Sequence, residues 1–324
     1  MSAQDRTLEQ YHQLMQINAA SHLVRAARSL GILAELRKGQ RTLEQLSESL
    51  RLSREPASGL LDALIAIGII EKYGDDYALS QAAQLLCQYD EDLGDARWQR
   101  LPDLVRGQSD RQQNDEQRHF DYLAATQWIH TPAAMEAAEI LDIGGQGEVA
   151  GPKILDLGCG SAVWSCAMAY RDPEATISAV DNREALDAAE STANSIGILD
   201  RFEAKVSDPL EAELPADHFD WVVLAQRLSC LGPDVASRLV TKAAWAAKPG
   251  GRIVVIDLFR GPSRFNLAEC VQVLNLQLET RQGAVLTLEQ MESELREAGL
   301  DDIQFVFLSR SRANLGMSVA TKPR

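Results

Sequence analysis

Three carboxylates lie within, at the end of and just beyond three short runs with strand-like patterning in the second half of the chain. Asp156 lies in KILDLG, Asp181 closes TISAVD, and Asp208 follows RFEAKV. Such runs predict parallel strands, whose carboxyl ends meet at the sheet edge where ligands bind. Asp181 follows Gly160 by about 20 residues, the offset at which an acid accepts hydrogen bonds from a ribose diol. The acids therefore predict a nucleoside site.

The loop after the first of these runs indicates which nucleoside. Gly158 and Gly160 let the backbone pass close to a ligand at the start of the next helix, where free N–H groups attract an anion. A dinucleotide loop would have a third glycine at position 163, which is Val163, and Asp156 would bring a negative charge near the pyrophosphate. Both features disfavour an NAD-dependent oxidoreductase. S-adenosylmethionine has no phosphate and carries an ammonium group, so the loop fits it better.

At these residues the sequence resembles the class I S-adenosylmethionine-dependent methyltransferases. LDLGCGS at 155–161 is similar to their first motif, AVD at 179–181 to their ribose-binding acid, and AKPGGRIVVID at 247–257 to their fifth strand. With its N-terminal helices, the chain is similar to the small-molecule O-methyltransferases of plant, bacterial and hydroxyindole type. The resemblance implies a homodimeric enzyme that methylates a small aromatic or polyketide-like acceptor, preferably on oxygen, and leaves S-adenosyl-L-homocysteine.

The resemblance also implies roles for single residues. Gly158 and Gly160 would lie against the methionine part, Asp181 would hold the ribose hydroxyls, and Asp208 would accept from the adenine amino group. The resemblance further places Val206 and Ser207 beside the adenine and Ala225 and Gln226 at the sulfonium end. The complete predicted cofactor set is Asp156, Gly158, Gly160, Asp181, Asn182, Ser207, Asp208, Ala225 and Gln226. Asp156 fits equally well as a buried acid that satisfies loop N–H groups.

The general base that the resemblance leads us to expect is missing. These enzymes place a histidine after the fourth strand, in a stretch like L-H-x-W, whereas this chain has LAQRLSCLGPD with Ser229 at that position. A phenol with a pKa near 10 must lose its proton for attack, and serine is a poor base. Three accounts stay open. Another base acts; the acceptor is already acidic or nucleophilic and Arg227 holds its anion; or the protein binds the cofactor for non-methylating chemistry. The candidates for the base are His119, His130 and Asp257.

Composition narrows the partners. Acids outnumber bases 47 to 32, and the formal charge of −15 disfavours nucleic acid. The five cysteines form no C-x-x-C pair and no metal-type spacing with the five histidines, so we expect reduced thiols and no metal site. No segment has the roughly 18 apolar residues of a membrane helix, and the N-terminus has no apolar leader, so we expect a cytoplasmic protein.

The first part of the chain predicts helices and a hairpin. Helices are expected at 14–30, 42–50 and 53–67, followed by a hairpin in IIEKYGDDYALS at 69–80. This order is that of a winged helix. Its potential recognition helix carries only Arg54 as a base, so dimerisation is favoured over DNA binding, and a cofactor-sensing regulator is the alternative. TLEQ occurs at Thr7, Thr42 and Thr287, and each copy predicts a helix start with a capping box.

The remaining pattern predicts the architecture. Two or three helices are expected within 82–150, with the aromatic residues Trp98, Phe120, Tyr122 and Trp128 in either a substrate cleft or the core. From Lys153 strands and helices alternate, the third helix ends at Lys248-Pro-Gly-Gly, and IQFVFL and LGMSVAT close the chain as an antiparallel pair. We therefore predict an α/β fold: a doubly wound, Rossmann-like, seven-stranded methyltransferase domain preceded by a mostly helical, winged-helix-like domain. The predicted bounds are 1–95 for the dimerisation domain, 96–150 for a helical linker contributing to the substrate cleft, and 151–324 for the cofactor-binding domain.

Overall fold

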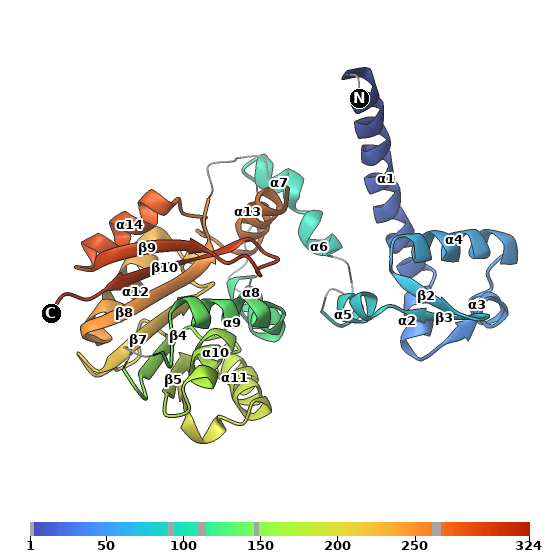
Figure 1. Cartoon of the computed structure of the whole chain (residues 1–324). Coiled ribbons are helices and arrows are strands. Elements are labelled where there is room, and N and C mark those ends of the chain that lie inside the picture. The colour runs from blue at the N-terminus through green and yellow to red at the C-terminus, as the bar shows by residue number, and fades with distance from the viewer. Residues whose placement is uncertain (1–2, 90–91, 93, 109–114, 146–148, 261–266) are drawn as a thin grey trace. The chain divides into compact units, whose positions relative to one another are not determined.

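The computed structural model describes residues 3–89, 92, 94–108, 115–145, 149–260 and 267–324 (Figure 1). The chain divides into two compact units, Met1–Trp98 and Gln99–Arg324. Each unit has its own apolar core, so each is described by itself.

The first unit combines helices with a small sheet. Its helices are α1 (Ala3–Ser29), α2 (Ile32–Arg37), α3 (Leu43–Leu50), α4 (Arg54–Ala66), α5 (Gln81–Tyr89) and α6 (Asp95–Trp98). Its strands β1 (Arg41–Thr42), β2 (Ile70–Tyr73) and β3 (Asp76–Leu79) form a sheet in the order β1-β3-β2. The hairpin expected at 69–80 is confirmed, with Ile70 paired to Leu79 and Tyr73 to Asp76. Leu46, Leu64 and Ile70 are fully buried and connect α3, α4 and β2 in one core.

Two of the three predicted capping boxes are confirmed. At α3 the Thr42 hydroxyl accepts from Gln45 N at 3.2 Å, and the Gln45 side chain accepts from Thr42 N at 3.0 Å. Thr287 and Gln290 repeat the arrangement at the start of α14 (Leu288–Glu297). The prediction at Thr7 is wrong, because α1 already begins at Ala3 and Thr7 lies inside it. A capping box needs the unpaired N–H groups of a first turn, which an interior position does not offer.

The second unit is built on a seven-stranded sheet with the strand order β6-β5-β4-β7-β8-β10-β9. The five strands β4 to β8 are parallel, and β10 is antiparallel to both β8 and β9. Their bounds are β4 (Lys153–Leu157), β5 (Thr176–Asp181), β6 (Phe202–Val206), β7 (Phe219–Ala225), β8 (Ala247–Leu258), β9 (Asp301–Phe307) and β10 (Leu315–Thr321). The predicted doubly wound α/β fold is confirmed, including its antiparallel closing pair.

Helices cover both faces of this sheet (Figure 1). One face packs against α9 (Thr131–Ile140), α10 (Val163–Arg171) and α11 (Arg183–Ser195), and the other against α12 (Pro233–Ala246) and α14. Strand alternation assigns each residue of β4 to one face. Ile154 belongs to the core beneath α10, whereas Leu155 and Leu157 belong to the core beneath α12. Asp156 therefore faces α10.

Three local predictions differ from the structure. The third helix of the alternating pattern ends at Ala246, and Lys248-Pro-Gly-Gly lies within β8, which begins five residues before the expected Arg252. Residues 82–150 hold more helices than expected: besides parts of α5, they are α6, α7 (Leu101–Val105), α8 (Asp115–Thr126), the 3-10 helix η1 (Gln127–His130) and α9. Helix α13 (Leu267–Glu279) was not predicted, although Asn266 followed by Glu269 is a start signal in the sequence. Short 3-10 helices η2 (Leu199–Arg201) and η3 (Leu228–Cys230) complete the elements.

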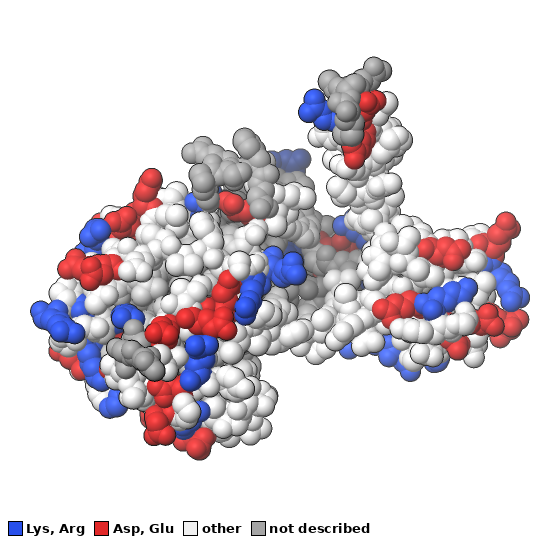
Figure 2. All heavy atoms as spheres, in the orientation of Figure 1, with Lys and Arg blue, Asp and Glu red and all other residues white. Residues whose placement is uncertain are grey.

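The surface carries charges of both signs. On the face shown in Figure 2, Lys and Arg side chains alternate with Asp and Glu side chains on both units. Among the described helices none is long and apolar enough to cross a membrane. Within the same residues, no group of three His, Cys, Asp or Glu side chains could hold a metal ion.

Candidate functional site

The glycine loop after β4 is fixed by Asp181 at the end of β5. Gly160 N donates to Asp181 Oδ2 at 3.0 Å, and Asn182 N donates to Asp181 Oδ1 at 2.8 Å. Gly158 N donates to Val180 O at 2.8 Å, which ties the same loop to β5. Asp181 is 4% exposed, and each of its oxygens retains a lone pair. The carboxylate therefore holds the loop and can still accept hydrogen bonds from a ligand.

Asp156 lies beneath this loop in a nearly dry environment. It is 1% exposed, and Ser165 Oγ of α10 donates to its Oδ2 at 2.5 Å. Its Oδ1 is buried without a hydrogen-bond partner within the described residues. Burial, assisted by the nearby Asp181 charge and opposed by the Ser165 hydrogen bond, raises the pKa of Asp156 from 3.8 to about 7. The prediction that Asp156 satisfies loop N–H groups is wrong, because the hydrogen bond that Asp156 accepts comes from the Ser165 hydroxyl and its other oxygen has no partner in the described residues.

The residues predicted beside the adenine lie at the neighbouring strand ends. Asn182 Oδ1 accepts from Ala185 N at 2.8 Å, so this side chain is the N-cap of α11. Ser207 N donates to Asp181 O at 3.1 Å, and this bond connects the end of β6 to the end of β5. Asp208 is exposed, and its Oδ1 accepts from Leu210 N at 2.7 Å. Asp208 and Asp181 thus share one edge of the sheet, as the spacing predicted.

The residues after β7 reach toward α10. Ala225 is buried, and Gln226 has a positive φ of 54° while its N–H donates to Ile256 O at 2.6 Å. Gln226 Nε2 lies 3.2 Å from His130 Nε2, and Gln226 Oε1 is buried without a partner in the described residues. The His130 ring stacks on Trp164 with centroids 6.0 Å apart. Burial lowers the pKa of His130 from 6.5 to about 4, so the ring is neutral at pH 7.

Ser229 and Asp257 form a buried pair. Ser229 Oγ donates to Asp257 Oδ1 at 2.6 Å, Ser229 N donates to Oδ2 at 2.9 Å, and Leu258 N donates to Oδ1 at 2.8 Å. Both residues are at most 5% exposed, and burial raises the pKa of the Asp257 carboxyl while these hydrogen bonds lower it. Asp257 therefore holds η3 onto the end of β8.

Arg227 lies against the glycine loop. A Cβ on Gly158 would come within 2.9 Å of Arg227 Cδ, so the arginine stem fits only because residue 158 is a glycine. The guanidinium carbon lies 3.7 Å from the ring centroid of Phe120 of α8, and Phe120 packs against the core beneath α10. His119 is 6% exposed with its ring centroid 6.2 Å from that of Phe120. His119 and Arg227 thus both lie near the Phe120 ring.

Gln127 is a site residue that the sequence did not indicate. Its Oε1 accepts from Ser161 N at 2.9 Å and from Ser161 Oγ at 3.2 Å, immediately before α10. A Cβ on Gly160 would lie 2.5 Å from that oxygen, so Gly160 is required by the glutamine as well as by its φ of 54°. Gln127 is 3% exposed. A single glutamine 34 residues before its partner carries no local signal, and only the fold brings the two together.

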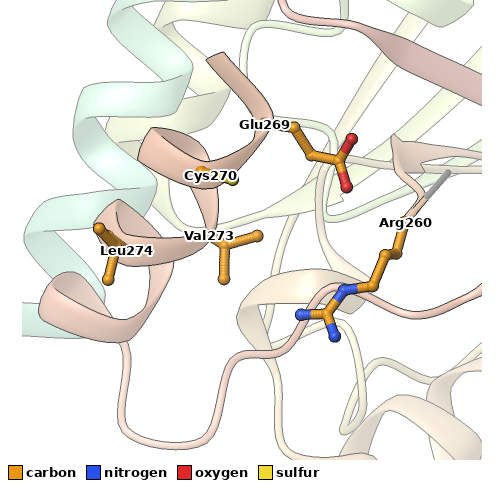
Figure 3. Close-up of a pocket in the computed structure, with 5 residues that line it drawn as sticks. All are labelled: Arg260, Glu269, Cys270, Val273 and Leu274. Carbon is orange, nitrogen blue, oxygen red and sulfur yellow. The ribbon is translucent and has the colours of Figure 1, made fainter. Parts of the chain in front are cut away.

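A pocket of about 390 Å³ lies beside α13 (Figure 3). Arg260 follows β8, and the other lining residues come from α13: Glu269, Cys270, Val273 and Leu274. Its lining is largely apolar apart from Arg260 and Glu269. Residues 261–266, which follow Arg260, lie outside the described residues.

The residues at this edge fit the predicted cofactor. An amino-acid tail needs acceptors for its ammonium group and donors for its carboxylate. Asp156 Oδ1 and Gln226 Oε1 are buried acceptors without partners in the described chain, and Arg227 Nε is a buried donor in the same condition. They come from β4 and from the segment after β7, which are adjacent parallel strands. Asp181 adds acceptors for hydroxyl groups.

Comparisons with known proteins agree with this site. Residues 154–251 match a family model described as a methyltransferase domain. The N,N-dimethyltransferase OxyT of Streptomyces rimosus is 26% identical over 318 residues, which cover 90% of both chains. A ubiquinone biosynthesis O-methyltransferase of Pseudomonas putida is 34% identical over 122 residues, 37% of this chain, and this match spans about half of that enzyme. Human N-acetylserotonin methyltransferase in complex with S-adenosylmethionine has a TM-score of 0.70 at 20% identity and covers 100% of this chain and 99% of its own.

The fold is thus that of the class I methyltransferases, with the matching domain spanning the glycine loop, β5, β6, β7 and the start of β8. The chain is an S-adenosylmethionine-dependent methyltransferase. The predicted class and cofactor are confirmed. The roles predicted for the single site residues stay predictions.

Proposed function

We propose that this protein transfers the methyl group of S-adenosylmethionine to a small-molecule acceptor whose nucleophile needs no strong general base. One observation carries the proposal: Asp181 holds the glycine loop at the sheet edge, while unpaired buried acceptors and a donor lie on the strands beside it. When bound, the cofactor supplies an electrophilic methyl group on a positive sulfur. The chain itself then has to orient the acceptor and exclude water.

His130 is a weak candidate for the missing base. It lies at the sulfonium end predicted for Gln226, but burial lowers its pKa to about 4. Proton transfer from a phenol with a pKa near 10 to such a group is unfavourable by about 6 pKa units, or about 8 kcal/mol. His130 therefore serves better as a neutral partner that orients Gln226 than as a proton acceptor.

Asp257 is a weak candidate for a different reason. Its two oxygens accept from the Ser229 hydroxyl and from the backbone of Ser229 and Leu258. A carboxylate that is engaged in this way holds the loop, and protonating it would weaken three hydrogen bonds at once. Of the accounts that the sequence left open, the one with an already acidic or nucleophilic acceptor has the best physical support.

Oxygen is our preferred acceptor atom, as a hydroxyl acidic enough to ionise near neutral pH. A neutral amine nitrogen is the second candidate. It is favoured by the match over 90% of the chain to OxyT, which is an N,N-dimethyltransferase. Both nucleophiles avoid the need for a histidine at Ser229, and aromatic or polyketide-like frameworks suit the apolar lining near α13.

Calorimetry and a turnover assay test the proposal. We expect S-adenosylhomocysteine to bind the full chain at micromolar concentration and NADH not to bind. With S-adenosylmethionine, we expect S-adenosylhomocysteine to be released when nitrophenols, which ionise near neutral pH, are the acceptors, and little to be released with the corresponding simple phenols. Release on aromatic amines in place of both would select the nitrogen alternative.

Two results would contradict the proposal. Binding of NADH in place of S-adenosylhomocysteine would make the site a dinucleotide site. Binding of S-adenosylhomocysteine without turnover on any acceptor would support non-methylating chemistry. If that protein also shifted DNA in a sequence-dependent way at low salt, the regulator hypothesis would replace the enzyme.

A further inference from the structure

Arg227 is a half-buried cation that has no anionic partner in the part of the chain that the structure describes. Its Nε is fully buried and unpaired, and its guanidinium forms no hydrogen bond or ion pair within the described residues. Guanidinium groups in protein interiors normally meet a carboxylate, because an unpaired charge is costly to remove from water. The contact that the structure does give this group is the face of the Phe120 ring, at 3.7 Å.

The neighbouring acids do not explain the arginine. Asp181 accepts from Gly160 N and Asn182 N, and Asp156 accepts from Ser165. Neither carboxylate forms an ion pair with Arg227. Neutralising the acids at the sheet edge is therefore not the role of this side chain.

The stem of Arg227 is held in place from two sides. Its Cδ lies against Gly158, where any Cβ would approach it to 2.9 Å, and its head lies on Phe120. A guanidinium fixed in this way loses little conformational freedom when it forms two parallel hydrogen bonds to a carboxylate. The guanidinium is therefore preorganised to bind an anion. Phe120 covers one of its faces, and its N–H groups remain available for hydrogen bonds.

We infer that Arg227 binds a carboxylate brought into the site by a small molecule. The inference rests on the proposed function, because the ligands of a methyltransferase site offer two sources of such an anion. One is the amino-acid carboxylate of the cofactor, and the other is an anionic group of the acceptor. The position against Gly158, at the loop predicted to meet the methionine part, favours the cofactor.

Titration calorimetry with two cofactor fragments distinguishes the sources. S-adenosylhomocysteine carries the carboxylate, whereas 5′-methylthioadenosine has the same adenosine without the amino-acid tail. Arg227→Met keeps the stem and removes the charge. We expect it to weaken S-adenosylhomocysteine binding about 10- to 100-fold and to leave methylthioadenosine binding within about twofold of the wild type. Arg227→Lys should recover part of the loss, because it restores the charge without the planar fork.

A second titration tests whether the carboxylate belongs to the acceptor. If Arg227→Met binds S-adenosylhomocysteine as the wild type does, both proteins are saturated with it and titrated with 4-hydroxybenzoate and with its uncharged methyl ester. Weaker binding of the acid alone by the variant would assign the carboxylate to the acceptor. Arg238→Met is the matched control, because Arg238 is 66% exposed on α12 and should leave every titration unchanged.

The inference and the proposed function fail differently. If wild-type protein does not bind S-adenosylhomocysteine, the proposed function is wrong. If the wild type binds it but Arg227→Met matches the wild type in both arms, the inference is wrong. It is also wrong if the variant weakens methylthioadenosine as much as S-adenosylhomocysteine, because Arg227 would then act on the loop and not on a carboxylate.

Discussion

Replacing Asp181 by alanine should abolish most of the affinity for adenosine-containing ligands. The wild-type carboxylate anchors Gly160 N at 3.0 Å and Asn182 N at 2.8 Å, and its remaining lone pairs face the predicted ribose. A hydrogen bond to a charged group contributes about 1.5 to 3 kcal/mol, so losing two to a ribose corresponds to at least about 100-fold in affinity. Calorimetry with S-adenosylhomocysteine measures this loss directly.

The same substitution also affects folding, and this effect has to be separated. Asp181→Ala leaves two backbone N–H groups without their acceptor, which should lower the free energy of unfolding by about 2 kcal/mol. Thermal unfolding with both ligand-free proteins measures this term. Asp181→Asn keeps the shape and one acceptor, so we expect smaller losses of both stability and affinity. Asp187→Asn is the control, because Asp187 is 66% exposed and its ion pair with Arg183 contributes little.

Adenosine is the decisive probe for the ribose assignment. It has the diol but neither the sulfur nor the amino-acid tail, so Asp181→Ala should weaken adenosine and S-adenosylhomocysteine by similar factors. An alanine variant that remains folded and binds adenosine within about threefold of the wild type would refute the assignment of Asp181 to the ribose.

Three further predictions concern other parts of the molecule. Ser229→Ala should lower the free energy of unfolding in urea by about 1 to 3 kcal/mol, because Asp257 loses its hydroxyl donor, yet change kcat/KM less than tenfold; a loss of 1000-fold would make Ser229 catalytic. Burial raises the pKa of Asp156 from 3.8 to about 7, so the folded state binds the extra proton between these values and wild-type stability falls as pH rises through them. Asp156→Asn should therefore be stabilising by about 4 kcal/mol at pH 8 and by little at pH 4, and an equal gain in Tm at both values would contradict the shift. On α1, Tyr11 and Leu14 are 59% and 61% exposed, so we predict a homodimer that forms through this helix. The double variant Tyr11→Glu with Leu14→Glu should sediment as a monomer, whereas the control Gln13→Glu should sediment as the wild type does. An unchanged sedimentation coefficient of the double variant would exclude α1 as the dimer contact.

The sheet was predictable because its signals are local. Most of the parallel strands contain an apolar run, while β6 alternates apolar residues with Glu203 and Lys205, and an acid at a strand end is recognisable from the segment before it. Thr42 and Thr287 were also predictable, since a capping box lies within four residues. The same pattern at Thr7 gave a wrong prediction. A capping box requires a helix that begins there, and residues 3–6 are already helical.

The partners of the site residues were not predictable, because they depend on packing between distant segments. Gln127 meets Ser161 only after η1 has been placed against α10, and Phe120 meets Arg227 through α8. Asn182 illustrates a different limit. It was assigned to the cofactor by resemblance, and its side chain caps α11, a role that the sequence alone also allows. Sequence thus located the edge of the sheet but not the bonds made there.

The missing histidine is consistent with catalysis by positioning. A general base contributes about 10² to 10⁴ in rate, whereas holding the nucleophile in line with the methyl group can contribute effective molarities of about 10⁵ to 10⁸ M. The described polar groups serve the second purpose: Asp181 fixes the glycine loop, Asp257 fixes η3, and neutral His130 lies against Gln226. Because none of them is a strong base at neutral pH, the acceptor has to ionise without help from the protein. The rate should therefore follow the ionisation of the acceptor, rising with pH to a plateau at the pKa of each nitrophenol, and a plateau at one fixed pH for all acceptors would reveal a base in the protein.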